Sequence, residues 1–265
     1  MKILLTGPSG NLGVQITKYS PYDIIRLNRE DWDRLPEILA TGIDIVIHLA
    51  YDLKNKIENS PTNIIDSNLV TTTRLIEAMS RYNTPRLVFP SSCAVYGESM
   101  QTNEETACRP ISVNGIVKLL NEKIIERYCS INNIKYVIYR IFNMYGGDDK
   151  FSVIYHLNRA LENGTEFCLN NNGISQRDFV HIDDVAKIIL KLIAVDHPYT
   201  HLNIGTGVST RIIEIVTSVA QKCRSLRIKN AYMPEAEYSR ANITKLSSLL
   251  HYNFINVLDF VNRIF

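Results

Sequence analysis

Short apolar segments of strand length alternate along this chain with longer segments of helical periodicity. The strand-like segments are almost continuous in Ile, Val and Leu, so both faces of a sheet built from them must be covered by helices. This alternation predicts an α/β fold with a Rossmann-type, doubly wound parallel sheet. The predicted strands are Lys2–Thr6, Ile24–Asn28, Asp44–Leu49, Arg86–Pro90 and Lys135–Ile141, and the predicted helices include Ile64–Tyr82 and Val113–Tyr128.

The chain contains no internal repeat and no Gly/Ser/Pro linker that would divide it into independent domains. Its composition changes after Gly147, where loop-like excursions alternate with segments of buried-sheet character at Phe179–Val185 and His201–Gly205. We therefore expect a small, discontinuous C-terminal substrate lobe beside the sheet. The expected division is a dinucleotide-binding domain over 1–150, which also receives roughly 177–208, and a substrate-binding lobe made mainly of 151–176 and 209–265.

Composition excludes several classes of protein. The 265 residues carry 29 basic and 27 acidic side chains without a Lys/Arg block, so neither a nucleic-acid nor a membrane partner is expected. The five cysteines are scattered and odd in number, which predicts neither a disulfide framework nor a structural zinc site. The sequence shows no signal-peptide pattern and no apolar run of membrane-spanning length, so we expect a soluble, cytoplasmic protein.

The histidines and paired carboxylates do not predict a metal site. His48 and His181 lie inside apolar, strand-like runs, so we interpret them as core histidines. Asp183 and Asp184 precede a helical segment, where capping and helix-dipole effects explain them. No metal is therefore expected.

A glycine-rich loop, Gly7-Pro-Ser-Gly-Asn-Leu-Gly13, follows the first strand directly and opens a helix. Its three glycines permit a tight turn and let backbone amides approach a pyrophosphate at the positive end of that helix. An ordinary strand-to-helix turn is the alternative, but the position after the first strand of an alternating fold favours a dinucleotide site. The candidate residues are Gly7, Gly10, Asn11, Leu12 and Gly13.

The end of the second strand bears on the choice of cofactor. An acidic residue is expected there when the adenosine ribose is unphosphorylated, because a carboxylate accepts a hydrogen bond from the 2′-hydroxyl. Here the strand ends in Asn28 and Arg29, and an amide followed by a guanidinium suits a 2′-phosphate. NADP is therefore favoured over NAD. In the alternative, Arg29 is a solvated loop charge and Glu30 or Asp31 binds the ribose.

Further motifs follow in a specific order and spacing. In that order the chain resembles the extended short-chain dehydrogenase/reductase family, in its NAD-dependent epimerase/dehydratase branch, which acts mostly on nucleotide-activated sugars. The resemblance covers nearly the whole chain and weakens after about Arg224. The motifs that carry it, besides the glycine-rich loop, are Asp44–Ala50, Asn68, Ser91–Gly97, Lys118, Arg140–Gly146, Arg177–Ala186 and Leu202–Gly207.

The resemblance implies cofactor roles for several residues beyond the glycine-rich loop. Leu49 and Ala50 match the family's loop under the adenine and ribose, and Asn68 matches its helix asparagine. Lys118 matches the active-site lysine, which in the family holds the nicotinamide ribose hydroxyls and lowers the pKa of the adjacent tyrosine.

Other positions match the family's substrate residues. Ser92 matches the catalytic Ser or Thr four residues before Tyr96 of the Val-Tyr-Gly motif, and it is expected to bind the reacting oxygen. Tyr96 is itself a candidate substrate contact. Asn143 resembles a residue that contacts the sugar diphosphate, and Arg177 resembles one that binds the nucleotide diphosphate. Arg240 is a candidate for a second phosphate contact.

Asn114 stands where the family has its catalytic tyrosine. In the family's hydride chemistry, that tyrosine exchanges a proton with a sugar hydroxyl, and a carboxamide cannot titrate in this range. General acid–base groups contribute a factor of about 10² to 10⁴, so cofactor binding should survive while the chemical step is crippled.

Three hypotheses account for Asn114. In the first, another group supplies the proton, with Tyr96, Tyr145 and Cys93 as candidates, although packing explains such tyrosines and a buried cysteine is usually inert. In the second, the protein has lost the chemistry and binds NAD(P) or a sugar nucleotide as the partner module of another enzyme. In the third, Asn114 is an introduced substitution.

The resemblance implies an NAD(P)-dependent oxidoreductase or epimerase that modifies a nucleotide sugar in surface polysaccharide biosynthesis. The strand end that favours NADP also favours a ketoreductase, because a reductase must exchange its cofactor whereas an epimerase recycles it. The family also implies a homodimer, in which the helices at Ile64–Tyr82 and Val113–Ser130 of two copies form a four-helix bundle. An apolar helix face that covers the sheet is the alternative.

Overall fold

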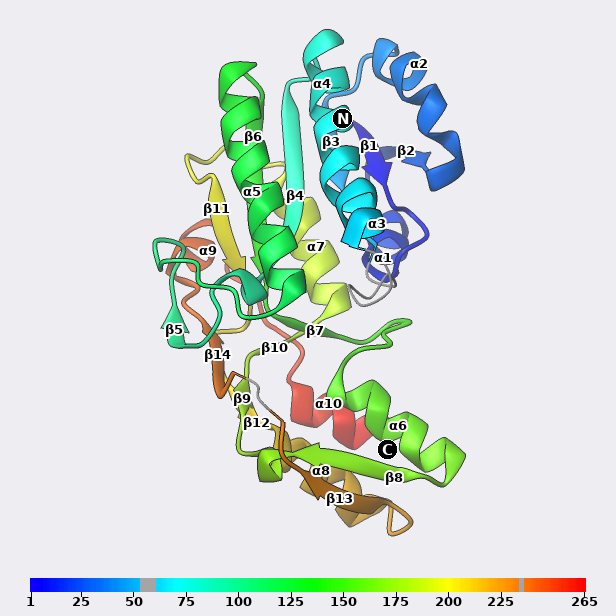
Figure 1. The fold of residues 1–265 in the computed structure, drawn as a ribbon, viewed down its shortest axis with the longest axis vertical. Helices are drawn as coiled ribbons and strands as arrows, with labels where there is room; N and C mark the ends of the chain where they lie inside the picture. The colour runs from blue at the N-terminus through cyan, green and yellow to red at the C-terminus, as the bar shows by residue number, and fades with distance from the viewer. Residues whose placement is uncertain (53–60, 234–235) are drawn as a thin grey trace. The chain divides into compact units, whose positions relative to one another are not determined.

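The computed structural model describes residues 1–52, 61–233 and 236–265, which form two compact units (Figure 1). The predicted dinucleotide-binding domain and substrate lobe are distinguished by the ligands that they bind, so this division stays a prediction. The second unit takes in residues 141–150 and 177–185, which the sequence groups with the nucleotide-binding part. The first unit comprises Met1–Gly97, Ala107–Arg140 and Ala186–Leu202, and the second comprises Glu98–Thr106, Ile141–Val185 and Asn203–Phe265.

A six-stranded sheet with the order β11-β6-β4-β3-β1-β2 is the centre of the fold. β1 pairs in parallel with both β2 and β3, and β3 pairs in parallel with β4. The chain thus winds outward in both directions from β1 and β3, which confirms the predicted Rossmann-type sheet. The strands are β1 (Lys2–Thr6), β2 (Asp23–Leu27), β3 (Ile45–His48), β4 (Arg86–Ser92), β6 (Lys135–Ile141) and β11 (His201–Ile204).

Both faces of this sheet are buried, as the continuous apolar strands predict. Leu4, Val46 and Phe89 belong to a core shared with α2, α4 and α5, while Ile3 and Ile47 alternate to the other face and are equally buried. In Figure 1, α4 and α5 lie in front of the sheet and α7 lies behind it. The helices are α1 (Asn11–Tyr19), the 3₁₀ turn η1 (Arg29–Arg34), α2 (Leu35–Ala40), α4 (Thr71–Arg81), α5 (Val113–Ile131) and α7 (Ile182–Leu192).

The segment predicted as one helix over 64–82 consists of three successive helical stretches. α3 (Pro61–Ile65) leads into the π-helical turn η2 (Asp66–Val70), and α4 follows directly. Such turns interrupt the regular helical spacing and are frequent at functional sites. In this one the polar side chain of Asn68 is buried, with 1% of its surface exposed.

The second unit combines short sheets with helices that pack around Leu157, Val216 and Val261. Its four-stranded sheet has the order β12-β9-β14-β5, and β10-β7 and β13-β8 form separate pairs. Only the first part of the predicted sheet segment at 179–185 is a strand, because Asp183 and Asp184 favour the helix start that follows. The strands are β5 (Ser99–Thr102), β7 (Asn143–Tyr145), β8 (Glu166–Asn170), β9 (Gln176–Arg177), β10 (Phe179–His181), β12 (Thr210–Arg211), β13 (Arg227–Ala231) and β14 (Tyr238–Ala241), and the helices are α6 (Val153–Asn163), α8 (Ile212–Lys222), α9 (Thr244–Leu249) and α10 (Val257–Ile264).

The helices of the described ranges are also informative about membranes. None of them combines the length and the apolar character needed to cross a bilayer.

Candidate functional site

The glycine-rich loop between β1 and α1 is a tight turn in which backbone segments approach one another closely. Gly7 has a φ of +65°, and a Cβ there would lie 2.8 Å from the amide nitrogen of Ala50. A Cβ at Gly13 would lie 2.5 Å from the carbonyl oxygen of Gly7, and the amide of Gly10 donates to that same oxygen at 3.1 Å. These positions require glycine, which explains the spacing seen in the sequence.

The N-terminus of α1 fits the pyrophosphate of a dinucleotide. Gly10 occupies the N-cap position without a capping side chain, and Asn11 begins the helix. The N-cap residue therefore contributes no side chain at the positive end of α1, where backbone amides and the helix dipole favour an anion. The amides at 11–13 would hold the pyrophosphate, with Leu12 buried beneath them.

The end of β2 is lined by carboxylates. The guanidinium of Arg29 lies 3.3 Å from Oδ2 of Asp52, and the side-chain Nδ2 of Asn28 donates to Oδ2 of Asp31 at 3.4 Å. The two side chains expected to meet a 2′-phosphate are thus directed toward acidic groups. Carboxylates at this place repel a phosphate and accept from a ribose hydroxyl, which suits NAD.

The backbone after β3 is fastened to its neighbours by hydrogen bonds. The amide of Leu49 donates to the carbonyl of Thr6 at 3.2 Å, and the amide of Ala50 donates to the Thr6 hydroxyl at 3.1 Å. The amide of Asp52 donates to Oδ1 of Asn68 at 2.8 Å. Asn68, expected to bind the cofactor, therefore holds the segment around residue 51 in place.

Lys118 lies between two aromatic rings beside the end of β4. Its Nζ donates to the carbonyl of Pro90 at 2.9 Å and lies 3.9 Å from the ring centre of Tyr51 and 4.7 Å from that of Phe89. Burial lowers the pKa of Lys118 to about 7, with the charge of Glu122 opposing the shift. A lysine with this pKa changes its charge near neutral pH.

Asn114 lies one turn before Lys118 on α5. Its Oδ1 is buried and has no hydrogen-bond partner among the described residues. Ser92, at the end of β4, accepts a hydrogen bond from the amide of Ala94 at 3.2 Å, a contact that does not use its own hydroxyl hydrogen. The site thus offers a hydroxyl donor and an amide acceptor, but position 114 cannot exchange a proton.

The three candidates for the missing acid are Tyr96, Tyr145 and Cys93, and both tyrosine side chains are buried in contacts with neighbouring groups. Tyr96 is 2% exposed and its ring lies against the guanidinium of Arg140, at 4.8 Å. Tyr145 is fully buried and donates to the carbonyl of Ile255 at 3.2 Å, and burial raises the pKa of its hydroxyl. Cys93 is partly buried in the 3₁₀ turn η3 (Cys93–Val95) that follows Ser92.

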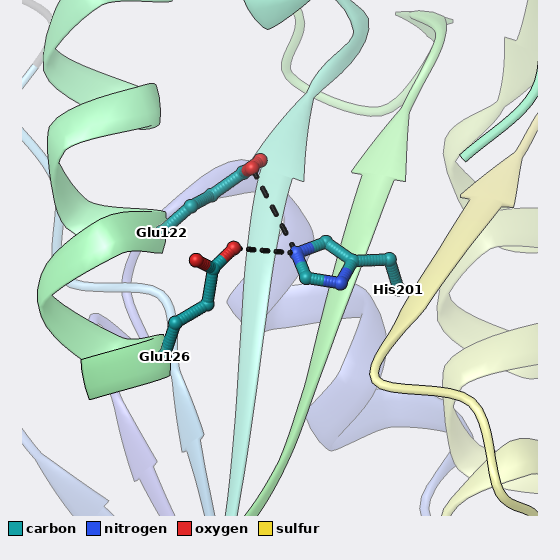
Figure 2. A group of neighbouring side chains, drawn as sticks. All are labelled: Glu122, Glu126 and His201. Atoms are coloured by element: carbon teal, nitrogen blue, oxygen red, sulfur yellow. Dashed lines mark ion pairs between the residues drawn. The ribbon is translucent and has the colours of Figure 1, made fainter. Parts of the chain in front are cut away.

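A buried group of charges, missed by the sequence analysis, joins α5 to β6 and β11. Figure 2 shows Glu122 and Glu126 pointing toward His201, whose Nε2 lies 3.1 Å from Glu126 and 4.0 Å from Glu122. These three side chains have the spacing of metal ligands. However, the Glu122 carboxylate already accepts from Arg140 at 2.7 Å and from the Ser91 hydroxyl at 2.5 Å, so its charge is compensated. Two glutamates four residues apart on one helix were the available sequence signal.

His48 is a core histidine, as its apolar surroundings suggest. Its Nδ1 and Nε2 lie 2.7 Å and 3.1 Å from the hydroxyls of Thr6 and Thr72, and burial lowers its pKa to about 3. His181 packs its ring against Tyr145 in the second unit. Both rings are therefore held by neighbouring side chains of their own units.

The second unit contains a cavity of about 800 Å³, a volume typical of small-ligand sites. Asn143 and Arg177, the predicted substrate residues, both line it. Asn143 donates to the carbonyl of Asp178 at 3.0 Å, and Arg177 donates to the carbonyl of Ala236 at 2.5 Å. The structure thus brings these two residues to one cavity wall.

Arg240 lines a smaller cavity of about 330 Å³, together with Gln176, Ser209 and Tyr238. Its Nε is buried and lacks a hydrogen-bond partner within the described ranges. A buried donor without a partner is costly, so a polar or anionic ligand would stabilise this side chain. Of the predicted substrate residues, Asn143, Arg177 and Arg240 lie in the second unit, while Ser92 and Tyr96 lie in the first with the predicted cofactor residues.

Known proteins resemble this chain in sequence and in fold. The NAD dependent epimerase/dehydratase family matches residues 3–205. UDP-glucuronate 4-epimerase of Thermodesulfobacterium geofontis is 26% identical over 90% of this chain and 76% of its own length. The structure of UDP-glucuronic acid 4-epimerase from Bacillus cereus, in complex with UDP-glucuronic acid and NAD, has 22% identity and a TM-score of 0.86 over the whole of both chains. UDP-glucose 4-epimerase from Thermus thermophilus, in complex with NAD, has 22% identity and a TM-score of 0.84 over 99% of this chain and 97% of its own.

The expectation of NADP as cofactor is wrong. The matching family is described as NAD dependent, and both of these solved structures contain NAD. The physical reason is visible at the end of β2, where Asp52 and Asp31 engage Arg29 and Asn28 and put negative charge where a 2′-phosphate would lie. By the extent of the family match, this chain belongs to the NAD-dependent epimerase/dehydratase family.

Proposed function

We propose that this protein is an NAD-dependent epimerase of a UDP-linked hexose or hexuronic acid. The observation that carries the proposal is the set of groups at one edge of the central sheet. The glycine-rich loop follows β1, the Tyr51 segment follows β3, and Ser92 ends β4, beside Lys118 of α5. Ligands of doubly wound folds bind at the carboxyl ends of the strands, where these groups gather.

Each group has a task in such a reaction. NAD would be held by the glycine-rich loop and would supply a group that accepts a hydride from a sugar carbon and gives it back. Ser92 donates its hydroxyl hydrogen to the reacting sugar oxygen, and Lys118 supplies positive charge where negative charge develops. The amides at 11–13 hold the pyrophosphate of the cofactor.

The cavity in the second unit supports a nucleotide sugar as substrate. Its volume of about 800 Å³ accommodates a ligand of that size, and it presents the guanidinium of Arg177 and the amide of Asn143. Guanidinium groups recognise phosphate oxygens well. Arg240 is the proposed second phosphate contact.

Epimerisation is favoured over reduction because the argument for a ketoreductase depended on NADP. An epimerase regenerates its cofactor in every cycle and therefore gains by holding NAD. A role in cytoplasmic assembly of surface polysaccharides is part of the proposal, since activated sugars are their precursors. A homodimer is the proposed assembly, because Ile116, Leu120 and Tyr128 leave an apolar stripe exposed on α5.

The test is direct. The purified protein would be denatured to measure released NAD, and then incubated with UDP-glucose, UDP-galactose, UDP-glucuronate and their N-acetylated analogues. Proton NMR of the anomeric region reports conversion between epimers. Binding of NAD and sugar nucleotide without turnover would favour the alternative of a binding module. The observation that supports this alternative is Asn114, which cannot transfer a proton. Failure to bind NAD would contradict the proposed epimerase, and failure to bind either NAD or a sugar nucleotide would contradict both.

A further inference from the structure

We propose that Tyr51 is the acid–base residue of this site, in place of the tyrosine absent at position 114. Its ring lies 3.9 Å from Nζ of Lys118, the side chain with which a proton-transferring phenol must be paired here. The assignment rests on the proposed function, because it concerns the proton step of that reaction.

Tyr51 is held in place by the chain on both sides. The preceding amide, of Ala50, donates to the Thr6 hydroxyl at 3.1 Å, and the following amide, of Asp52, donates to Asn68 at 2.8 Å. Tyr51 itself is only partly buried. A phenol on a fastened backbone at the carboxyl end of β3 is preorganised at the edge where ligands of this fold bind.

The electrostatics of the pair suit proton transfer. Burial raises the pKa of Tyr51, so its phenolate requires a nearby cation. Lys118 is the cation that lies against it, and the groups that act on Lys118 include the ring of Phe89, the carbonyl of Pro90, the carboxylate of Glu122 and the ring of His48. Nζ of Lys118 lies over the ring of Tyr51, so the structure places a lysine directly against the phenol.

Other candidates are less well placed for this step. The carboxamide of Asn114 has no titratable proton. Tyr96 is buried against Arg140, and Tyr145 donates its hydroxyl hydrogen to a main-chain carbonyl in the core of the second unit.

The proton balance is simple. In the oxidation half, the O–H bond of the sugar hydroxyl breaks and a new O–H bond forms on the phenolate of Tyr51, while the C–O bond becomes a carbonyl and the carbon's hydride goes to the NAD cofactor. In the reduction half, the hydride returns to carbon and Tyr51 gives the same proton back to the sugar oxygen. No proton is gained or lost over the cycle. Lys118 stabilises the phenolate of Tyr51 at the start and at the end of the cycle, when the phenol is ionised.

The first test is Tyr51→Phe, which keeps the ring against Lys118 and removes the hydroxyl. We expect kcat to fall by about 10²-fold or more, with the Kd for NADH and the KM for the sugar nucleotide within about twofold. Tyr19→Phe is the matched control, because the ring of Tyr19 also lies against a lysine, with Nζ of Lys187 at 4.6 Å, but on the far end of α1. Adding Asn114→Tyr to Tyr51→Phe should restore part of the lost rate. A kcat for Tyr51→Phe within threefold of the parent protein would overturn the assignment.

A second test needs no turnover. The difference between the pH titrations of phenolate absorbance for the parent protein and Tyr51→Phe isolates the ionisation of Tyr51. Lys118→Arg, whose guanidinium stays charged at the pH where a buried phenol ionises, should move that ionisation to lower pH, because an adjacent cation stabilises the phenolate. An unchanged titration would refute the pairing. If no sugar is turned over but the titration shifts, the proposed function fails while the Tyr51–Lys118 pair stands.

Discussion

The buried ion pair between Glu122 and Arg140 yields a quantitative prediction for stability. The side chains are 0% and 4% exposed, and the guanidinium contacts the carboxylate through NH2 at 2.7 Å and Nε at 3.2 Å. Removal of one partner leaves the other charge in the interior without compensation, which costs about 3–5 kcal/mol. We therefore expect Glu122→Met and Arg140→Met each to lower the free energy of unfolding by that amount.

The double variant separates this effect from loss of packing. Glu122→Met combined with Arg140→Met removes both charges and keeps apolar volume, so it should cost much less than the sum of the single changes. Ser91 loses its acceptor in the double variant, which leaves a residual cost of about 1 kcal/mol.

Urea unfolding followed by the fluorescence of Trp32 is a suitable assay, because this single tryptophan packs against the core of the first unit. Arg159→Met is the control, since Arg159 and Glu162 form a pair with side chains 50% and 51% exposed, worth less than about 1 kcal/mol. Additive single costs, or a Glu122→Met change below about 1 kcal/mol, would refute the reasoning.

Four further predictions follow from the site. Gly13→Ala should raise the Kd for NAD, measured by calorimetry, at least about tenfold, because its Cβ would lie 2.5 Å from the Gly7 carbonyl oxygen. An unchanged Kd would contradict the binding of NAD by the glycine-rich loop. Arg240→Met should raise the KM for the sugar nucleotide about tenfold in initial-rate assays and leave the Kd for NAD unchanged, as loss of one charged hydrogen bond implies. The kcat should decline as pH rises through about 7, since Lys118 then loses the charge that stabilises a phenolate, and a profile that rises there would argue against this role. Leu120→Glu should convert a dimer into monomers by light scattering, because it buries a charge in the proposed α5 interface.

Several features could be predicted because their causes are local. β1 and β6 span the residues expected from their continuous apolar runs, and Gly13 must be glycine for a steric reason that lies within the loop, because its Cβ would meet the Gly7 carbonyl oxygen. The π-helical turn around Asn68 could not be predicted, because nothing in the helical periodicity of that segment marks an inserted residue.

The cofactor shows why local reasoning can fail. Arg29 at the end of β2 suits a phosphate when considered alone, but its guanidinium lies 3.3 Å from Asp52, a residue 23 positions away. Whether a surface charge is available to a ligand depends on the charges that the fold brings to it, and a local pattern does not contain them.

The sequence by itself determined the alternating fold, the dinucleotide loop and the absence of a titratable group at Asn114, since each depends on residue type and short-range spacing. Only the tertiary structure decided which side chains meet. Tyr51, Lys118 and Phe89 come from three separate segments, as do Glu122, Arg140 and His201. Their contacts depend on the order of β3, β4 and β6 in the sheet and on the packing of α5 against it. Side chains distant in the chain meet only when the fold brings together the strands and the helix that carry them.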